Sequence, residues 1–273
     1  MSATRRFLPA DPAELARSLV PIGLLVVAAA VPLLRIPVLI AVGAGAGVAI
    51  ARDAPVRWTW AAAVPVALGL VWGTLPAPQA ALDGSDCANP ASPVATWRAL
   101  EAIVVLAALV ALAFVLKASP GSLWLRWPAR RWVRLAAVRF LATGPVALLA
   151  GPYFARPFFG DVGYELVAGA VVPALVFAVA NGVMEELIYR GALLGWSARV
   201  MGLGPAVVGQ AVVFGVAHSG SDVIGFQLPL MLALGVGGLL AGIIAVRTRS
   251  LLVPIAVHIG FDIPIYFAFA CGT

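Results

Sequence analysis

The chain has 273 residues, of which 62% are hydrophobic and 11% are charged, and its formal net charge is +6. Soluble domains carry about a quarter charged residues, so this composition excludes a soluble globular domain. A basic excess in a membrane protein is typical of cytoplasmic loops, and we expect no binding to nucleic acid. Lys117 is the only lysine, and the preference for arginine, with many Ala and Gly residues, indicates a bacterial source.

The apolar residues form blocks of about 17 to 22 residues, which is the length of a transmembrane helix. They predict an all-α protein, a polytopic transmembrane helical bundle of about 8–9 spans. In chain order, the predicted spans are 18–34, 36–51, 60–75, 97–116, 135–151, 165–189 or beyond, 205–219, 226–246 and 251–269. Few residues are available for a turn between the first two predicted spans, in the stretch from Pro32 to Pro37. If this hairpin does not cross the membrane, eight spans remain.

The basic residues are placed asymmetrically along these spans. With the N-terminus inside, the outer segments hold only Arg35, Arg98 and Arg156 as basic residues. The positive-inside rule therefore predicts a multi-pass protein of the bacterial inner or plasma membrane, with a cytoplasmic N-terminus and an extracytoplasmic C-terminus. Cys87 and Cys271 then both lie outside, where a disulfide is permitted but not required.

We divide the chain into an N-terminal region of five spans, residues 1–162, and a C-terminal region, residues 163–273. The N-terminal region includes a segment near 120–134 that mixes tryptophans with arginines. We expect this segment to lie along the cytoplasmic membrane surface, held by anionic lipid and by aromatic burial. An ordinary basic loop is the alternative.

Ionisable residues within the spans are concentrated in the C-terminal region. Each costs about 2.5–3.5 kcal/mol by insertion scales, so such residues usually have a function. They are Glu185, Glu186 and Arg190 in the sixth predicted span, His218 in the seventh, and His258 and Asp262 in the last. The two histidines of the chain both belong to this set.

Helical spacing suggests how these residues pair. Glu186 and Arg190 are four apart and share a helix face, so a buried ion pair can form. Glu185 is rotated from Glu186 by about 100° and is able to face another helix. His258 and Asp262 are also four apart, so Asp262 can accept a hydrogen bond from the imidazole.

The depth of these groups depends on the length of the sixth helix. If it continues to the basic turn at Arg199, Glu185 and His218 both lie about 21 Å from that turn. By the same count, His258 and Asp262 lie about 12 and 18 Å above the inner end of the last helix. A shared polar layer therefore requires the long sixth helix.

Three short motifs in this region resemble those of a known family. The sequence Glu185-Glu186-Leu-Ile-Tyr-Arg190 resembles the EExxxR motif of the CAAX protease and bacteriocin-processing (CPBP) family, which includes the type II CAAX prenyl endopeptidases. Phe214-Gly-Val-Ala-His218 is similar to its FxxxH motif, and His258-Ile-Gly-Phe-Asp262 to its HxxxN/D motif. The resemblance covers roughly residues 163–270 and makes this C-terminal region a CPBP-like catalytic domain.

The resemblance implies an intramembrane endopeptidase that cleaves a membrane-associated or lipidated peptide or protein, with no cofactor expected. Glu185 and His218 would then activate a water molecule, while Glu186 and Arg190 brace the site. His258 and the residue at 262 would stabilise the oxyanion, and Phe214 would support the site by packing. Asn is commoner than Asp at the last motif position. An ionised Asp262 cannot donate to an oxyanion, so it either orients His258 or stays protonated.

Two other interpretations of the same residues remain open. Zinc is possible, because Glu185, His218 and His258 are residue types that bind zinc, and this would make the protein a zinc-dependent intramembrane metalloprotease. Alternatively, a non-catalytic membrane immunity or transport protein could use the same buried charges as a relay. No HExxH motif supports the first alternative, and no repeated halves support transport.

Overall fold

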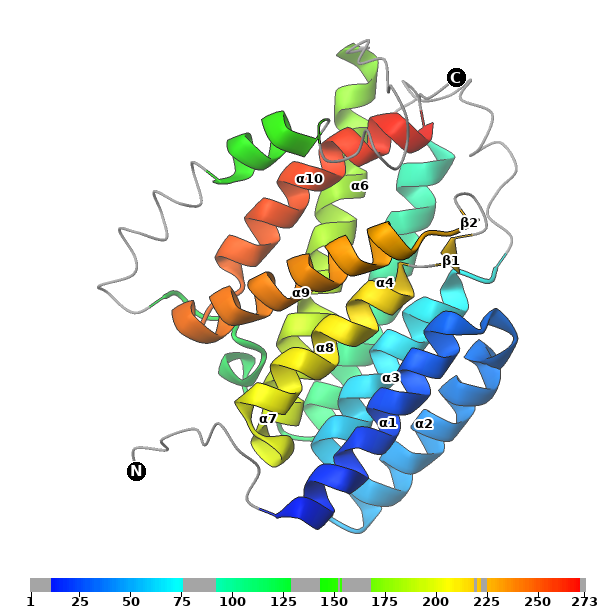
Figure 1. Cartoon of the computed structure of the whole chain (residues 1–273), viewed down its shortest axis with the longest axis vertical. Coiled ribbons are helices and arrows are strands. Elements are labelled where there is room, and N and C mark those ends of the chain that lie inside the picture. The colour runs from blue at the N-terminus through cyan, green and yellow to red at the C-terminus, as the bar shows by residue number, and fades with distance from the viewer. Residues whose placement is uncertain are drawn as a thin grey trace. The chain divides into compact units, whose positions relative to one another are not determined.

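The structure is a computed structural model, and it describes residues 11–75, 92–128, 143–151, 153, 168–218, 220–221 and 225–270. These residues are mainly helical, as predicted (Figure 1). The described sheet is a small antiparallel hairpin of two strands, β1 (Gly220–Ser221) and β2 (Gly225–Phe226). Cys87 and Cys271 lie outside the described residues, so their disulfide stays a prediction.

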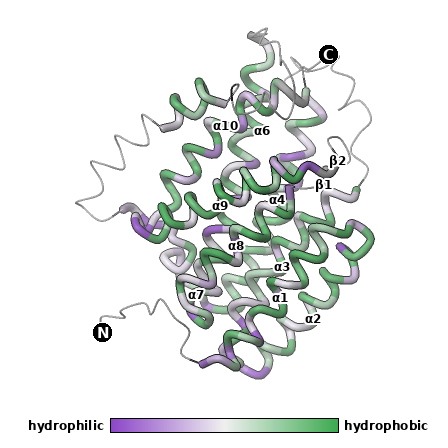
Figure 2. Tube along the Cα trace, in the orientation of Figure 1, coloured by the Kyte–Doolittle hydropathy of each residue, from purple (hydrophilic) through white to green (hydrophobic). Residues whose placement is uncertain are grey.

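Within the described residues, 5 helices are long and apolar enough to cross a membrane. Figure 2 shows hydrophobic residues along their lengths. They cover Pro12–Ala30, Pro32–Ala51, Pro93–Val115, Val171–Met201 and Leu228–Thr248, and shorter apolar helices cover Leu203–Ala217 and Leu252–Phe267. This pattern confirms the prediction of a polytopic, multi-pass helical membrane protein.

The chain divides into two compact units, each built from separate stretches of sequence. The first unit comprises Met1–Thr74, Val105–Arg126 and Leu187–Arg249. The second comprises Leu75–Val104, Trp127–Glu186 and Ser250–Thr273. The sequence-based division into residues 1–162 and 163–273 stays a prediction.

The first hairpin belongs to the first unit and is formed by α1 (Pro12–Ala30) and α2 (Arg35–Ala51). Asp11 caps α1 by accepting a hydrogen bond from the Ala13 N–H at 2.9 Å, which satisfies a backbone donor that the helix leaves open. The 3-10 turn η1 (Pro32–Leu34) joins the two helices. Its tight geometry makes the short connection possible, so both helices form.

Three of the remaining helices of the first unit pack against α1, and the fourth packs against one of these three. The three are α3 (Arg57–Trp72), α7 (Gly195–Met201) and α8 (Leu203–Ala217), and the fourth, α9 (Leu228–Thr248), packs against α8. Helices α1, α2 and α3 lie side by side, and α8 contacts both α1 and α9 (Figure 1). A Cβ atom on Gly215 of α8 would lie 2.7 Å from the Met231 carbonyl oxygen of α9. A small residue therefore permits this close helix contact, as is common in membrane proteins.

The basic and aromatic segment begins with residues that pack within the first unit. After the 3-10 helix η3 (Pro120–Leu123), Trp124 adopts a left-handed φ of 61° and is only 1% exposed. The Trp196 indole N–H of α7 donates to the Ser122 hydroxyl at 3.1 Å. Trp124 therefore packs inside the protein, and the expected position of the segment along the membrane surface stays a prediction. Residues 129–134 lie outside the described part of the chain.

The second unit contains the first part of α4 (Pro93–Val115), together with α6 (Val171–Glu185) and α10 (Leu252–Ala270). Helices α6 and α10 pack against each other along their length (Figure 1). Apolar residues from all three helices form one core, consisting of Ala95, Ala170, Ala174, Phe177, Tyr266, Phe267 and Ala270. This core lies beside the polar residues described next.

Candidate functional site

The EExxxR motif lies on a continuous helix from Val171 to Met201. A shared polar layer required a sixth helix that continues to Arg199, and the structure confirms this length. The helix is α-helical to Glu185, changes to the π-helix η5 over Glu186–Leu194, and returns to α-helix in α7. Most π-helical segments are single-turn bulges, and they often occur at functional sites. The nine-residue π-helix therefore gives this motif an unusual backbone conformation.

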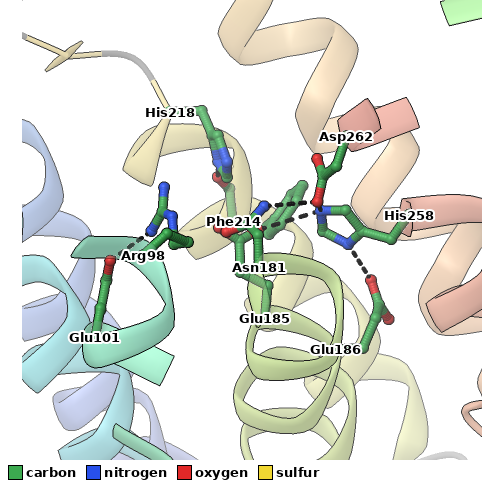
Figure 3. Close-up of polar contacts among 9 residues, drawn as sticks. All are labelled: Arg98, Glu101, Asn181, Glu185, Glu186, Phe214, His218, His258 and Asp262. Atoms are coloured by element: carbon green, nitrogen blue, oxygen red, sulfur yellow. Dashed lines mark hydrogen bonds and ion pairs between the residues drawn. The ribbon is translucent and has the colours of Figure 1, made fainter. Parts of the chain in front are cut away.

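Four of the predicted site residues meet in the second unit, where His258 of α10 lies among three carboxyl groups (Figure 3). The His258 Nδ1 atom lies 2.9 Å from a Glu186 carboxyl oxygen. On the other side of the ring, Nε2 lies 3.5 Å from Glu185 and 3.7 Å from Asp262. Both ring nitrogens therefore face carboxyl groups, which fixes the orientation of the imidazole.

The same contacts show how α6 and α10 are aligned. On α6, Phe177, Asn181 and Glu185 are four residues apart and share one face. The Phe177 ring packs against Tyr266 at 5.7 Å between centroids. The Asn181 amide donates to the Asp262 carboxylate at 2.9 Å, and Glu185 meets His258. Residues later in α6 contact residues earlier in α10, so the two helices are antiparallel.

These polar side chains are removed from solvent. Glu185 is 7% exposed, Glu186 2% and Asp262 3%. The His258 side chain is 15% exposed, so it keeps a small accessible surface. Isolated charges are costly to bury, and clustering lowers this cost because each group gains an oppositely charged or hydrogen-bonding neighbour.

One expected pairing differs from what the structure shows, and one member of a second pairing has a further contact. Asp262 was expected to accept a hydrogen bond from His258, but their separation of 3.7 Å is longer than a hydrogen bond, and Asn181 supplies the donor. Glu186 was expected to pair with Arg190, and the structure places its carboxyl oxygen against His258. The pairing of Glu186 with Arg190 stays a prediction, because these two residues belong to different compact units.

The other predicted residues lie in the first unit. The His218 Nδ1 atom lies 2.7 Å from the Phe214 carbonyl oxygen, and the two rings pack at 4.5 Å between centroids. The Arg190 guanidinium lies 4.1 Å from the centroid of the Phe214 ring, at a distance suited to a cation–π interaction. Phe214 thus contacts both Arg190 and His218. The expected pairing of His218 with Glu185 stays a prediction, since Glu185 belongs to the second unit.

Sequence reasoning missed three residues that accompany the site in the second unit. Asn181 donates to Asp262, and Arg98 forms an ion pair with Glu101 at 2.7 Å. For Asn181, the available signal was its place four residues before Glu185 on the same helix face. For Arg98, the signal was a position inside an apolar block, although the predicted topology assigned it to an outer segment.

A metal centre is a further possibility for residues of these types. Among the residues that the structure describes, no group of three or more His, Cys, Asp or Glu side chains is arranged to hold a metal ion. The suggested zinc ligands Glu185, His218 and His258 belong to both compact units. Zinc binding therefore stays a hypothesis for experiment.

Close contact between α6 and α10 at the site depends on Gly182. A Cβ atom there would lie 3.1 Å from the Ile259 Cγ1 atom and 3.2 Å from the Ile259 backbone nitrogen. We expect Gly182→Ala to push α10 outward by a few tenths of an ångström and so displace His258. Because catalysis is sensitive to displacements below 1 Å, the rate of a reaction at this site should fall about tenfold.

Gly23→Ala in α1 is the matched control, since a Cβ atom at Gly23 meets nothing within 4 Å. This control should retain activity and gain slightly in helix stability. Steady-state activity assays on both purified variants measure the effect. Equal activity of Gly182→Ala and wild type would show that the close contact does not set the position of His258.

Much of the C-terminal part of the chain matches a known protein family. Residues 167–264 match the model of the family described as type II CAAX prenyl endopeptidase, Rce1-like. The matched segment contains all three motifs, so it confirms the resemblance seen in the sequence, and it spans less than half of the chain. No curated protein and no solved structure matches the chain. The matched family is one of endopeptidases.

Proposed function

We propose that this membrane protein is an intramembrane endopeptidase that cleaves a membrane-associated or lipidated peptide or protein. The observation that carries the proposal is the buried cluster of Glu185, Glu186, His258 and Asp262. This cluster lies within the segment that matches an endopeptidase family. Its members come from two helices far apart in the sequence, and their contacts suit acid–base chemistry in a water-poor environment.

In the proposed reaction, Glu185 and His218 together activate a water molecule. Glu185 accepts one proton as the water oxygen attacks the carbonyl carbon of the scissile peptide bond. The C–N bond then breaks, and the proton is delivered to the leaving amine, which gives a carboxyl group and an amine as products. In this proposal His258 stabilises the negative oxygen of the tetrahedral intermediate by hydrogen bonding.

Supporting roles follow from the observed contacts. Asn181 holds Asp262 through a hydrogen bond, so Asp262 acts by keeping its carboxyl group near His258, not by donating to the oxyanion. Glu186 fixes the other ring nitrogen of His258. Arg190 and Phe214 brace the EExxxR and FxxxH segments through their cation–π contact.

For the cellular setting, we propose a bacterial inner or plasma membrane with a cytoplasmic N-terminus and an extracytoplasmic C-terminus. The lipid bilayer is then both the solvent of the protein and the source of its substrates. The proposed substrates are membrane-bound peptides or proteins, and nucleic acid has no part in the function. The positive-inside distribution of arginines supports this orientation.

The protein purified in detergent tests the proposal with prenylated peptides ending in a Cys-aliphatic-aliphatic-X sequence and with transmembrane peptides. We expect wild type to cleave at least one of these, with the cut located by mass spectrometry. His218→Ala should lower the rate tenfold or more, since a positioned acid–base group contributes about 10²–10⁴-fold. Cleavage should persist in a strong zinc chelator.

The other outcomes separate the alternatives. Loss of cleavage in chelator, restored by added zinc, would support the zinc-dependent metalloprotease in place of the metal-free mechanism. A folded wild-type protein that cleaves none of the peptides would contradict the endopeptidase proposal and favour a non-catalytic immunity or transport protein. Full activity of His218→Ala would remove His218 from the proposed mechanism.

A further inference from the structure

Helix α4 carries an arginine on its buried side. Inward-facing residues of this helix follow a three-and-four spacing at Ala95, Arg98, Ala102, Val105 and Leu109, which is the pattern of a single packed stripe. The apolar members of this stripe are at most 6% exposed. Large residues on other faces of the helix, such as Ile103 and Phe114, are 66% and 85% exposed. Arg98 therefore lies on the packed stripe of a mainly apolar helix, with its side chain 31% exposed.

Arg98 is held in place from two sides within the second unit. Its Nη1 atom donates to a Glu101 carboxyl oxygen at 2.7 Å, and Glu101 is itself buried. Its guanidinium also lies 5.8 Å from the centroid of the Phe177 ring on α6. Phe177 shares a helix face with Asn181 and Glu185, so the contact directs Arg98 toward the candidate site.

Arg98 lies on the same side of α6 as the candidate site, because the Phe177 ring that it contacts is one turn from Asn181, which donates to Asp262. Figure 3 shows the ion pair of Arg98 and Glu101. Opposite charges attract over several ångströms, so we expect the Arg98 charge to attract the carboxyl groups of Glu185 and Asp262. Three carboxyl groups, those of Glu185, Glu186 and Asp262, surround the imidazole of His258, and a fourth, that of Glu101, pairs with Arg98. Like charges repel strongly where water is scarce, so a fixed cation among these carboxyl groups offsets a large repulsion.

We infer that Arg98, anchored by Glu101, is a positioning residue that holds the carboxyl groups of Glu185 and Asp262 in their working places. This inference rests on the proposed endopeptidase function. Arg98 and Glu101 lie outside residues 167–264, the segment that matches the endopeptidase family. The N-terminal part of the chain thus contributes a charge that the matched segment uses.

Kinetics of the full-length protein test this role. We expect Arg98→Gln to lower kcat for peptide cleavage about tenfold with little change in KM, because the lost charge displaces reacting groups. Arg98→Lys keeps the charge and should restore part of the rate. Glu101→Gln should cause a smaller loss, since it only loosens Arg98. Arg247→Gln, at an exposed arginine in the last turn of α9, is the matched control and should behave as wild type.

A thermodynamic cycle tests the same role without any cleavage. Thermal midpoints are measured in detergent for wild type, Arg98→Gln, Asp262→Asn and the double variant. If Arg98 acts on Asp262, Arg98→Gln should lower Tm clearly less when Asp262 is already neutral, because interacting residues give non-additive effects. This readout stays valid if wild type cleaves no peptide, so failure of the proposed function is distinguishable from failure of this inference.

Three results would overturn the inference. Additive Tm changes in the cycle would show that Arg98 and Asp262 are independent. A raised KM with unchanged kcat would make Arg98 a substrate-binding residue instead. Equal losses for Arg98→Gln and Arg98→Lys, with an equal loss for Glu101→Gln, would show that the ion pair of Arg98 and Glu101 serves only to stabilise α4.

Discussion

Replacing Glu185 by Gln should reduce kcat/KM for peptide cleavage about 10²–10⁴-fold, which is the contribution typical of a positioned general base. Gln has nearly the same shape as Glu and can still contact His258, whose Nε2 atom lies 3.5 Å from the Glu185 carboxylate. However, an amide cannot accept the proton of the attacking water. The expected loss is therefore chemical, and the fold should be retained.

The measurement compares cleavage of the same lipidated or transmembrane peptide by wild type and by Glu185→Gln. Glu14→Gln is the matched control, because Glu14 lies in the first turn of α1, in the other compact unit. This control should cleave at the wild-type rate. A Glu185→Gln variant within a factor of about three of wild type would exclude Glu185 as the general base, whose loss should cost far more.

Replacing His258 by Leu should both abolish cleavage and destabilise the protein by about 3–5 kcal/mol, the usual cost of removing one partner from a buried charged pair. The imidazole contacts Glu186 at 2.9 Å and also faces Glu185 and Asp262. Leucine would remove the group that separates these carboxyl groups. The carboxyl groups would then repel one another in a medium that screens poorly.

Denaturant unfolding in detergent, followed by tryptophan fluorescence, measures the stability of this variant. His258→Gln provides the comparison, since its amide keeps a hydrogen-bond donor near the carboxyl groups. It should lose less stability than His258→Leu and still lose cleavage. Wild-type stability of His258→Leu would show that His258 does not hold the cluster together.

Hydrophobic block lengths determined the helical membrane architecture. Blocks long enough to span a bilayer predict helices, because an unpaired backbone is too costly in lipid. The structure places helices at the predicted positions within its described residues, including the first hairpin that the prolines made doubtful. The long sixth helix was also predictable, since a shared polar layer required it, but the π-helix over Glu186–Leu194 was not. Its hydrogen-bond pattern depends on packing, not on residue type alone.

The candidate site was partly predictable for a related reason. Ionisable residues in an apolar span are conspicuous, so Glu185, Glu186, His258 and Asp262 stand out from the residue order alone. Their partners did not follow, because spacing along one helix gives only contacts within that helix. The sequence thus suggested His258 with Asp262, which the structure places 3.7 Å apart, and Glu186 with Arg190, which stays a prediction. It did not suggest the contacts of Glu186 with His258 and of Asn181 with Asp262, which join two helices.

The sequence by itself determined that this is a membrane protein, where its helices lie and which ionisable residues belong to its C-terminal motifs. These features follow from the cost of burying polar groups and from the helix period, which can both be read from residue order. Only the tertiary structure decided which groups meet. The facing register of α6 and α10 pairs Asn181 with Asp262 and Glu185 with His258, and Arg98 of α4 contacts the Phe177 ring of α6. Such contacts depend on how helices pack side by side, and that packing is set by all of their side chains together.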